Sequence, residues 1–134
     1  MKKVAIVITS RASYSRIRNV LLALKKDKKI AFDLILASSV LLPKFGNFDE
    51  KIREDGFTIQ AKCFNLLEGS ILSNSARSTA ILISQLVDVF DRIEPDFVLT
   101  IADRYETLAT AVAASYSNIS LIHLQGGEIT GNID

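Results

Sequence analysis

Five side chains suited to ligand binding or proton transfer lie within or just after two short apolar segments of the chain. They are Asp103, Arg104, His123, Gln125 and Glu128. The segment 97–101 reads FVLTI, typical of a buried parallel strand, and the segment 121–124 reads LIHL. Neighbouring parallel strands end at the same edge of an open α/β sheet, and ligands bind at that edge. Acids, a fixed cation and a glycine pair there predict a phosphorylated ligand and proton chemistry.

Each of these residues also has a purely structural interpretation. In the structural interpretation of this pair, Asp103 caps a helix and Arg104 lies on the surface, and the pattern alone favours this interpretation and the functional one equally. His123 is the only histidine, and a lone histidine on a strand is more often structural than catalytic. The position of Asp103 at a central strand end, with Glu106 nearby, favours function. A carboxylate held by arginine can still exchange a proton with a sugar carbon or hydroxyl.

A second candidate site is the strand-to-helix turn at 9–15, which reads TSRASYS. Hydroxyl groups and Arg11 at a helix N-terminus favour an anion. Capping by Ser13 would explain the serines, but it leaves Arg11 unexplained, because a cation is unfavourable at the positive end of the helix dipole. The turn has no glycine, so it is neither a dinucleotide-binding GxGxxG nor a Walker loop.

The rest of the chain alternates strand-like and helical segments. Strands are predicted at 4–8, 32–37, 57–64, 97–101 and 121–124, and helices at 14–26, 49–54, 75–93 and through the alanine-rich segment that ends at 117. The third strand is less apolar and is expected nearer an edge. This alternation implies parallel pairing with right-handed crossovers, and the predicted fold is an α/β, Rossmann-like doubly wound parallel sheet.

Length and composition predict one globular domain. The chain has 134 residues, 49% of them apolar and 23% charged, which is enough for a real core. The formal net charge of +1 gives no electrostatic reason to expect nucleic acid or a membrane surface as a partner. No spacing of His, Cys and acids resembles a metal-ligand set, so we expect no metal and no other cofactor.

Cysteine content and the first residues indicate a cytoplasmic protein. Cys63 is the only cysteine, which rules out an internal disulfide framework, and it is expected to be buried. Lys2 and Lys3 with the apolar run 4–8 imitate the start of a signal peptide, but the run is too short and no cleavage site follows. No segment is long and apolar enough to cross a bilayer.

Three segments together resemble one enzyme family. They read TSRASYSRI at 9–17, FGNFDEKIREDGF at 45–57 and IADRYETLATAVAASYSNISLIHLQGGEITGNID at 101–134. In this order and spacing they resemble the hydrolysing UDP-N-acetylglucosamine 2-epimerases of the sialic acid and related nonulosonic acid pathways. ADRYE followed by IHLQGGE at this distance is the most specific part.

The resemblance implies a two-domain fold of the glycosyltransferase-B type, with a nucleotide sugar bound between two Rossmann-like halves. Residues 1–134 would be the N-terminal half, without the second domain, and we expect little or no activity from them alone. The implied reaction eliminates UDP from UDP-N-acetylglucosamine across C1 and C2 and then hydrates the glycal to N-acetylmannosamine. Expected partners are this substrate or UDP, a C-terminal domain or complementary subunit, and further copies of the chain in a homo-oligomer.

The resemblance also implies roles for single residues. The catalytic positions are Asp103, Gln125 and Asp134. The substrate-binding positions expected with them are Arg11, Ser15, Arg104, His123 and Glu128. Carboxylates fit this chemistry, because a C2 proton must leave while the departing diphosphate is assisted. Two positions depart from the family pattern: Gln125 replaces an acid often found there and cannot act as a general base, and Ala102 stands where glycine is usual.

Two other functions remain open from the sequence. The first is a non-catalytic module for nucleotide-sugar binding or subunit interaction, from a truncated or split gene. It would be distinguished by whether another polypeptide or reading frame supplies the second Rossmann unit. The other is a glycosyltransferase domain of the same architecture, which the DRYE and GGE segments favour less than an epimerase.

Overall fold

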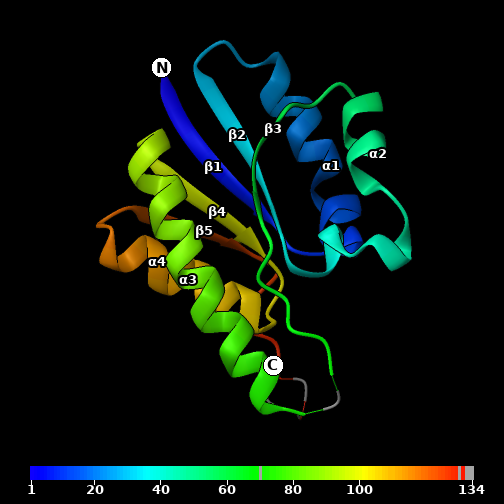
Figure 1. Ribbon diagram of the computed structural model, residues 1–134. Helices are drawn as coiled ribbons and strands as arrows, with labels where there is room; N and C mark the ends of the chain where they lie inside the picture. The colour runs from blue at the N-terminus through cyan, green and yellow to red at the C-terminus, as the bar shows by residue number, and fades with distance from the viewer. Residues whose placement is uncertain (70, 130, 132–134) are drawn as a thin grey trace.

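The computed structural model describes residues 1–69, 71–129 and 131, and it is built on a five-stranded parallel sheet (Figure 1). The strands are β1 (Lys2–Ile8), β2 (Ile30–Ala37), β3 (Ile59–Cys63), β4 (Phe97–Ile101) and β5 (Ser120–Leu124). The α-helices are α1 (Arg11–Lys26), α2 (Phe48–Glu54), α3 (Ser73–Ile93) and α4 (Tyr105–Tyr116). Two short 3-10 helices, η1 (Ser38–Leu41) and η2 (Pro43–Phe45), lie between β2 and α2.

The strand order is β3-β2-β1-β4-β5, and every neighbouring pair is parallel. The chain moves outward from β1 to β3 and then returns to add β4 and β5 on the other side of β1. The loops after β1 and β4 therefore begin side by side at the point where the order reverses, which is where open α/β sheets bind ligands. The predicted Rossmann-like doubly wound fold is confirmed.

The sheet separates two apolar cores. Helices α1 and α2 cover one face, and α3 and α4 cover the other (Figure 1). Along β1, Ile6 and Ile8 belong to the α1–α2 core, whereas Ala5 and Val7 belong to the α3–α4 core, as alternation along a strand requires. Burial of a side chain such as isoleucine contributes about 1.5–3 kcal/mol, so the packing on both faces holds the strand ends in place.

Helix α1 begins three residues earlier than the predicted start at 14. Ser10 is its N-cap, and the Ser10 hydroxyl accepts a hydrogen bond from the backbone N–H of Ser13 at 3.0 Å. The prediction that Ser13 caps the helix was therefore wrong. Ser13 lies inside the first turn, where it is buried and shares a hydrogen bond with the Ser10 hydroxyl at 2.8 Å. Two nearby serines made the sequence ambiguous about which one caps.

Strand β3 lies at an edge of the sheet, as predicted, but it is shorter than the predicted segment 57–64. Phe57 packs in the α1–α2 core rather than joining the sheet. Cys63 is buried, as expected, and burial raises the pKa of its thiol to about 11. Burial therefore reduces the already small thiolate fraction of Cys63 at neutral pH.

The buried face of α3 differs by about one residue from the prediction. The helical spacing of 75–93 predicts an apolar face made by Ile81, Ile83, Leu86, Val87 and Phe90. Leu86 and Phe90 are buried, but Leu82 is buried in place of Ile81 and Ile83, which are half-buried. The turn 81–83 is apolar all round, so its pattern alone did not indicate which residue faces the sheet. No helix in the described ranges is long and apolar enough to span a membrane. The cytoplasmic location stays a prediction.

Candidate functional site

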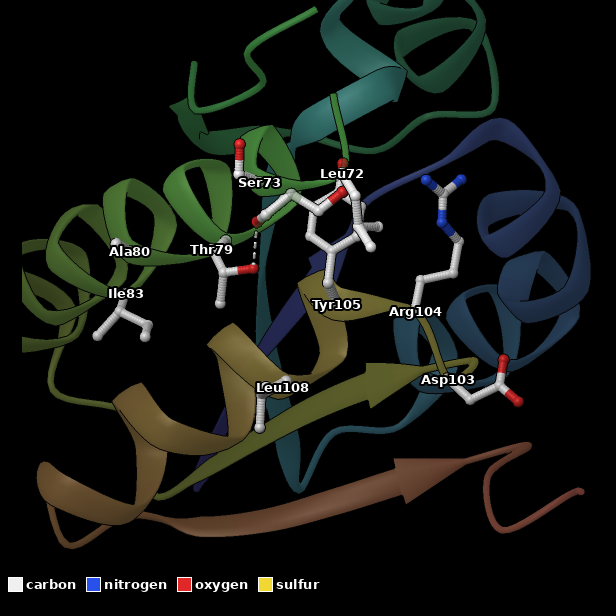
Figure 2. Close-up of a pocket in the computed structure, with 11 residues that line it drawn as sticks. Leu72, Ser73, Thr79, Ala80, Ile83, Asp103, Arg104, Tyr105 and Leu108 are labelled. Carbon is white, nitrogen blue, oxygen red and sulfur yellow. Dashed lines mark hydrogen bonds between the residues drawn. The ribbon is translucent and has the colours of Figure 1, made fainter. Parts of the chain in front are cut away.

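The loop after β4 carries Asp103 and Arg104 at the carboxyl edge of the sheet. Helix α4 follows directly, with Arg104 in the N-cap position and no side-chain capping bond. Asp103 is half-buried and makes no hydrogen bond or ion pair with any residue that the structure describes. Figure 2 shows its carboxylate pointing away from α3 and α4. The capping role considered for Asp103 is thus excluded, and its carboxylate is available for a ligand.

Arg104 extends from the N-terminus of α4 beside a buried acid. Its Nε lies 3.5 Å from Oε2 of Glu106, whose side chain is only 2% exposed, whereas the Arg104 side chain is 53% exposed. Its guanidinium carbon lies 5.4 Å from the centre of the Tyr105 ring. The sequence pointed to Glu106 only as a neighbour, because nothing in a first-turn glutamate indicates that it will be buried.

His123 links the ends of β5 and β4. Its Nε2 is hydrogen-bonded to the backbone carbonyl oxygen of Ala102, which also accepts a bond from the Thr107 hydroxyl at 3.1 Å. Because a carbonyl oxygen only accepts hydrogen bonds, Nε2 of His123 carries a proton and donates it to this bond. A Cβ on Gly126 would lie 1.9 Å from Cε1 of His123, so any side chain at 126 would force the ring out of this position. This contact is the structural role considered for His123; substrate binding by it stays a prediction.

Arg11 has protein partners that its sequence context did not indicate. Its Nη2 donates to the carbonyl oxygen of Gly46 at 3.2 Å, and its guanidinium carbon lies 5.1 Å from the Phe48 ring centre. These contacts hold the segment before α2 against the start of α1. They explain a cation at this helix N-terminus without an anion, although Nε of Arg11 is buried with no hydrogen-bond partner among the described residues.

The remaining predicted residues are spread along the same edge or lie beyond it. The Ser15 hydroxyl donates to the carbonyl oxygen of Arg11 at 3.1 Å from an exposed position on α1. Gln125 and Glu128 follow β5 and are exposed. Asp134 lies outside the described residues. The structure thus brings Asp103, Arg104 and, through the Ala102 carbonyl, the His123 ring together, while Ser15 makes only a contact within its own helix.

A groove of about 890 Å³ runs between α3 and α4 and reaches this edge (Figure 2). Asp103, Arg104 and Tyr105 line its end at the sheet edge, and the rest is mainly apolar. Leu108 on α4 and Ile83 on α3 belong to that apolar part. The sequence analysis did not predict this groove, because it depends on how closely two helices approach each other.

The edge combines a carboxylate that has no partner among the described residues with a half-exposed guanidinium. A guanidinium binds phosphate oxygens well, and a carboxylate beside it can accept or return a proton. Within the described residues, no group of three or more His, Cys, Asp or Glu side chains could hold a metal ion. The geometry thus suits a phosphorylated ligand that undergoes proton transfer.

Comparison with known families agrees with this chemistry. The model of the UDP-N-acetylglucosamine 2-epimerase family matches residues 22–134. The chain belongs to this family. The match includes β2 to β5 and the segments that follow β4 and β5 at the sheet edge.

Two curated relatives match the chain over nearly its full length. The GDP/UDP-N,N'-diacetylbacillosamine 2-epimerase (hydrolyzing) of Campylobacter jejuni is 33% identical over 99% of the chain, which spans 35% of that protein. The UDP-N,N'-diacetylbacillosamine 2-epimerase (hydrolyzing) of Legionella pneumophila is 32% identical over the entire chain and is matched over 36% of its own length. The chain thus spans about a third of the length of these relatives.

A solved structure shares the fold. The UDP-GlcNAc 2-epimerase of Neisseria meningitidis, bound to UDP-GlcNAc, superposes with a TM-score of 0.79 and 24% identity over 98% of this chain and 34% of that one. The fold of this chain therefore corresponds to the first part of the epimerase fold.

Both departures from the family pattern fall on unusual backbone positions. Ala102 has φ of +72° and Gln125 has φ of +56°, a region that glycine adopts without strain and other residues seldom adopt. The two residues end β4 and β5 and turn the chain at the site. A φ of this sign at position 102 would suit the glycine that the resemblance implies there.

Proposed function

We propose that this chain is the N-terminal, substrate-side half of a hydrolysing 2-epimerase that converts UDP-N-acetylglucosamine into N-acetylmannosamine and UDP. The observation that carries the proposal is Asp103, a carboxylate with no partner among the described residues, beside Arg104 at the end of β4. Membership of the 2-epimerase family supports the same reaction type. The second Rossmann-like domain, which would complete the cleft, is part of the proposal.

The reaction has two steps. In the first, the C2 proton leaves, the C1–O bond to the diphosphate breaks, and UDP departs from a 1,2-unsaturated sugar. In the second, water adds its oxygen at C1, and C2 gains a proton on the opposite face. Asp103 would exchange the proton, and Asp134 would supply the second carboxylate.

The cationic groups of the chain would act on the leaving group. Arg104 would meet the diphosphate, whose negative charge rises as the C1–O bond breaks. Arg11, at the neighbouring loop after β1, would add a second contact. Gln125 cannot remove a proton, so its amide would hold the sugar by hydrogen bonds, with Glu128, Ser15 and His123 as further binding groups.

UDP-N,N'-diacetylbacillosamine is the second candidate substrate. Two curated relatives that are 33% and 32% identical to the chain carry this sugar in their names, whereas the UDP-N-acetylglucosamine 2-epimerase of Neisseria meningitidis is 25% identical. Both sugars carry an acetamido group at C2 and differ only at positions away from C1 and C2, so the same elimination serves both.

The test is UDP release from each sugar, measured with residues 1–134 alone and joined to a second domain of this family. We expect the joined protein to release UDP together with the free 2-epimeric sugar, and residues 1–134 to do so little or not at all. Faster release of UDP from UDP-N,N'-diacetylbacillosamine than from UDP-N-acetylglucosamine would identify the diacetylated sugar as the substrate. UDP binding without turnover of either sugar would instead support the non-catalytic module.

A further inference from the structure

Glu106 is the only charged side chain that is fully buried among the residues that the structure describes. The residue is 1% exposed and lies in the first turn of α4, two positions after Arg104. A carboxylate is costly to bury unless cations or hydrogen-bond donors compensate its charge. The helix dipole favours an acid in this turn, but an exposed acid would gain from the dipole without losing its water. Its burial therefore needs a further explanation.

The contact with Arg104 compensates part of this buried charge, together with the side chain of Tyr105. Oε2 of Glu106 lies 3.5 Å from Nε of Arg104, and the Arg104 side chain is otherwise half in solvent. An arginine on a surface loop samples many rotamers, and a fixed anion at Nε restricts the direction of the guanidinium plane. Tyr105 restricts it further, since its ring lies 5.4 Å from the guanidinium carbon. Glu106 is itself too buried to reach a ligand in solvent.

We propose that Glu106 is a positioning residue, which holds the Arg104 guanidinium at the sheet edge so that it meets the diphosphate of the nucleotide sugar beside Asp103. This inference rests on the proposed function. It differs from a purely structural role of Glu106, in which the acid only stabilises the first turn of α4.

The test is a double-mutant cycle in the chain joined to its second domain, with the dissociation constant of UDP as the readout. Glu106→Gln keeps the shape of the side chain and removes its charge, and we expect it to weaken UDP binding about tenfold. In an Arg104→Ala background, the same change should have almost no further effect on UDP binding, because the group that Glu106 orients is gone. Glu106→Asp should restore part of the affinity.

Several outcomes separate the alternatives. If Glu106→Gln lowers the melting temperature but leaves UDP binding unchanged, or if its effect on UDP binding is equally large with and without Arg104, the positioning role is overturned and the proposed function stands. If Glu106→Gln does not fold, Glu106→Asp decides: UDP binding equal to that of the unaltered protein would overturn the role, and weaker binding that depends on Arg104 would support it. If the unaltered protein binds no UDP and releases none from either sugar, the proposed function fails, and this inference with it.

Discussion

The backbone N–H of Ala102 donates a hydrogen bond to the carbonyl oxygen of Leu124 at 2.9 Å, which joins the end of β4 to the end of β5. The His123 ring returns from β5 to the carbonyl oxygen of Ala102. Both polar groups of the Ala102 backbone are thus held by β5 at the residue before Asp103. The site is therefore positioned by two strands rather than by a free loop.

Gly126→Ala should damage this arrangement. The new Cβ would lie 1.9 Å from Cε1 of His123, so the ring must leave its bond to Ala102. We expect the free energy of unfolding, measured in urea, to fall by about 1–3 kcal/mol. In a His123→Ala background the same change should cost little, since the clash is gone. An equal loss in both backgrounds would contradict the account.

The stability of the fold should decrease in acid through Asp55. Its carboxylate accepts from the Tyr14 hydroxyl at 2.6 Å and from Arg18 at 2.8 and 2.9 Å, and it also accepts from Lys51 at 3.0 Å. Hydrogen bonds from Arg18 and Tyr14 hold the pKa of Asp55 well below its ordinary value of 3.8. A lowered pKa in the folded state stabilises the fold above that ordinary value, and this stability is lost as the pH falls toward the folded pKa.

Asp55→Asn tests this directly. We expect a loss of about 2 kcal/mol at pH 7 and a flatter dependence of the unfolding free energy on pH below about 4. Asp88→Asn, at an exposed position of α3, is the matched control and should change neither quantity. If the unfolding free energy of Asp55→Asn depended on pH below about 4 as strongly as that of the unaltered protein, other carboxylates would cause the acid dependence.

Cys63 should be inert in the folded protein. Burial raises the pKa of its thiol to about 11, and the thiolate is the reactive form. At pH 8 a thiol reagent such as DTNB should react slowly with the native chain and rapidly in urea. Equal rates in the two conditions would show that Cys63 is accessible.

The groove between α3 and α4 should promote self-association, in line with the expected homo-oligomer. Leu108 is 59% exposed and Leu72 is 69% exposed, and both line it. Leu108→Lys should shift sedimentation velocity profiles toward monomer, because a charge on an apolar contact costs desolvation energy. Lysine at Tyr116, which is exposed but does not line the groove, is the control. A native chain that stays monomeric at high concentration would refute the expectation.

The sequence was sufficient for the fold because its strands and helices have clear and different periods. The apolar run 97–101 predicted a strand with Asp103 just after its end, and in the structure Asp103 follows β4 at the sheet edge. The choice of capping residue was not predictable, since Ser10 and Ser13 are equally suited and only the course of the backbone distinguishes them. The apolar turn at 81–83 was ambiguous for a similar reason.

The contacts within the site could not be predicted from the sequence. Arg11 contacts Gly46 and Phe48, which lie more than 30 residues further along the chain. No local sequence pattern predicts that this segment returns to the start of α1. The need for glycine at 126 depends on the rotamer of His123, and the burial of Glu106 depends on the packing of α4. Each of these features is tertiary, and each sets how the candidate residues can act.

The most direct test of the central claim is turnover of UDP-N-acetylglucosamine in deuterium oxide by the chain joined to its second domain, with Asp103 intact or replaced by asparagine. The account predicts UDP and free N-acetylmannosamine with one deuterium at C2, and a rate lower by about 100-fold or more for Asp103→Asn. N-acetylmannosamine without deuterium at C2, or an undiminished rate for Asp103→Asn, would contradict it.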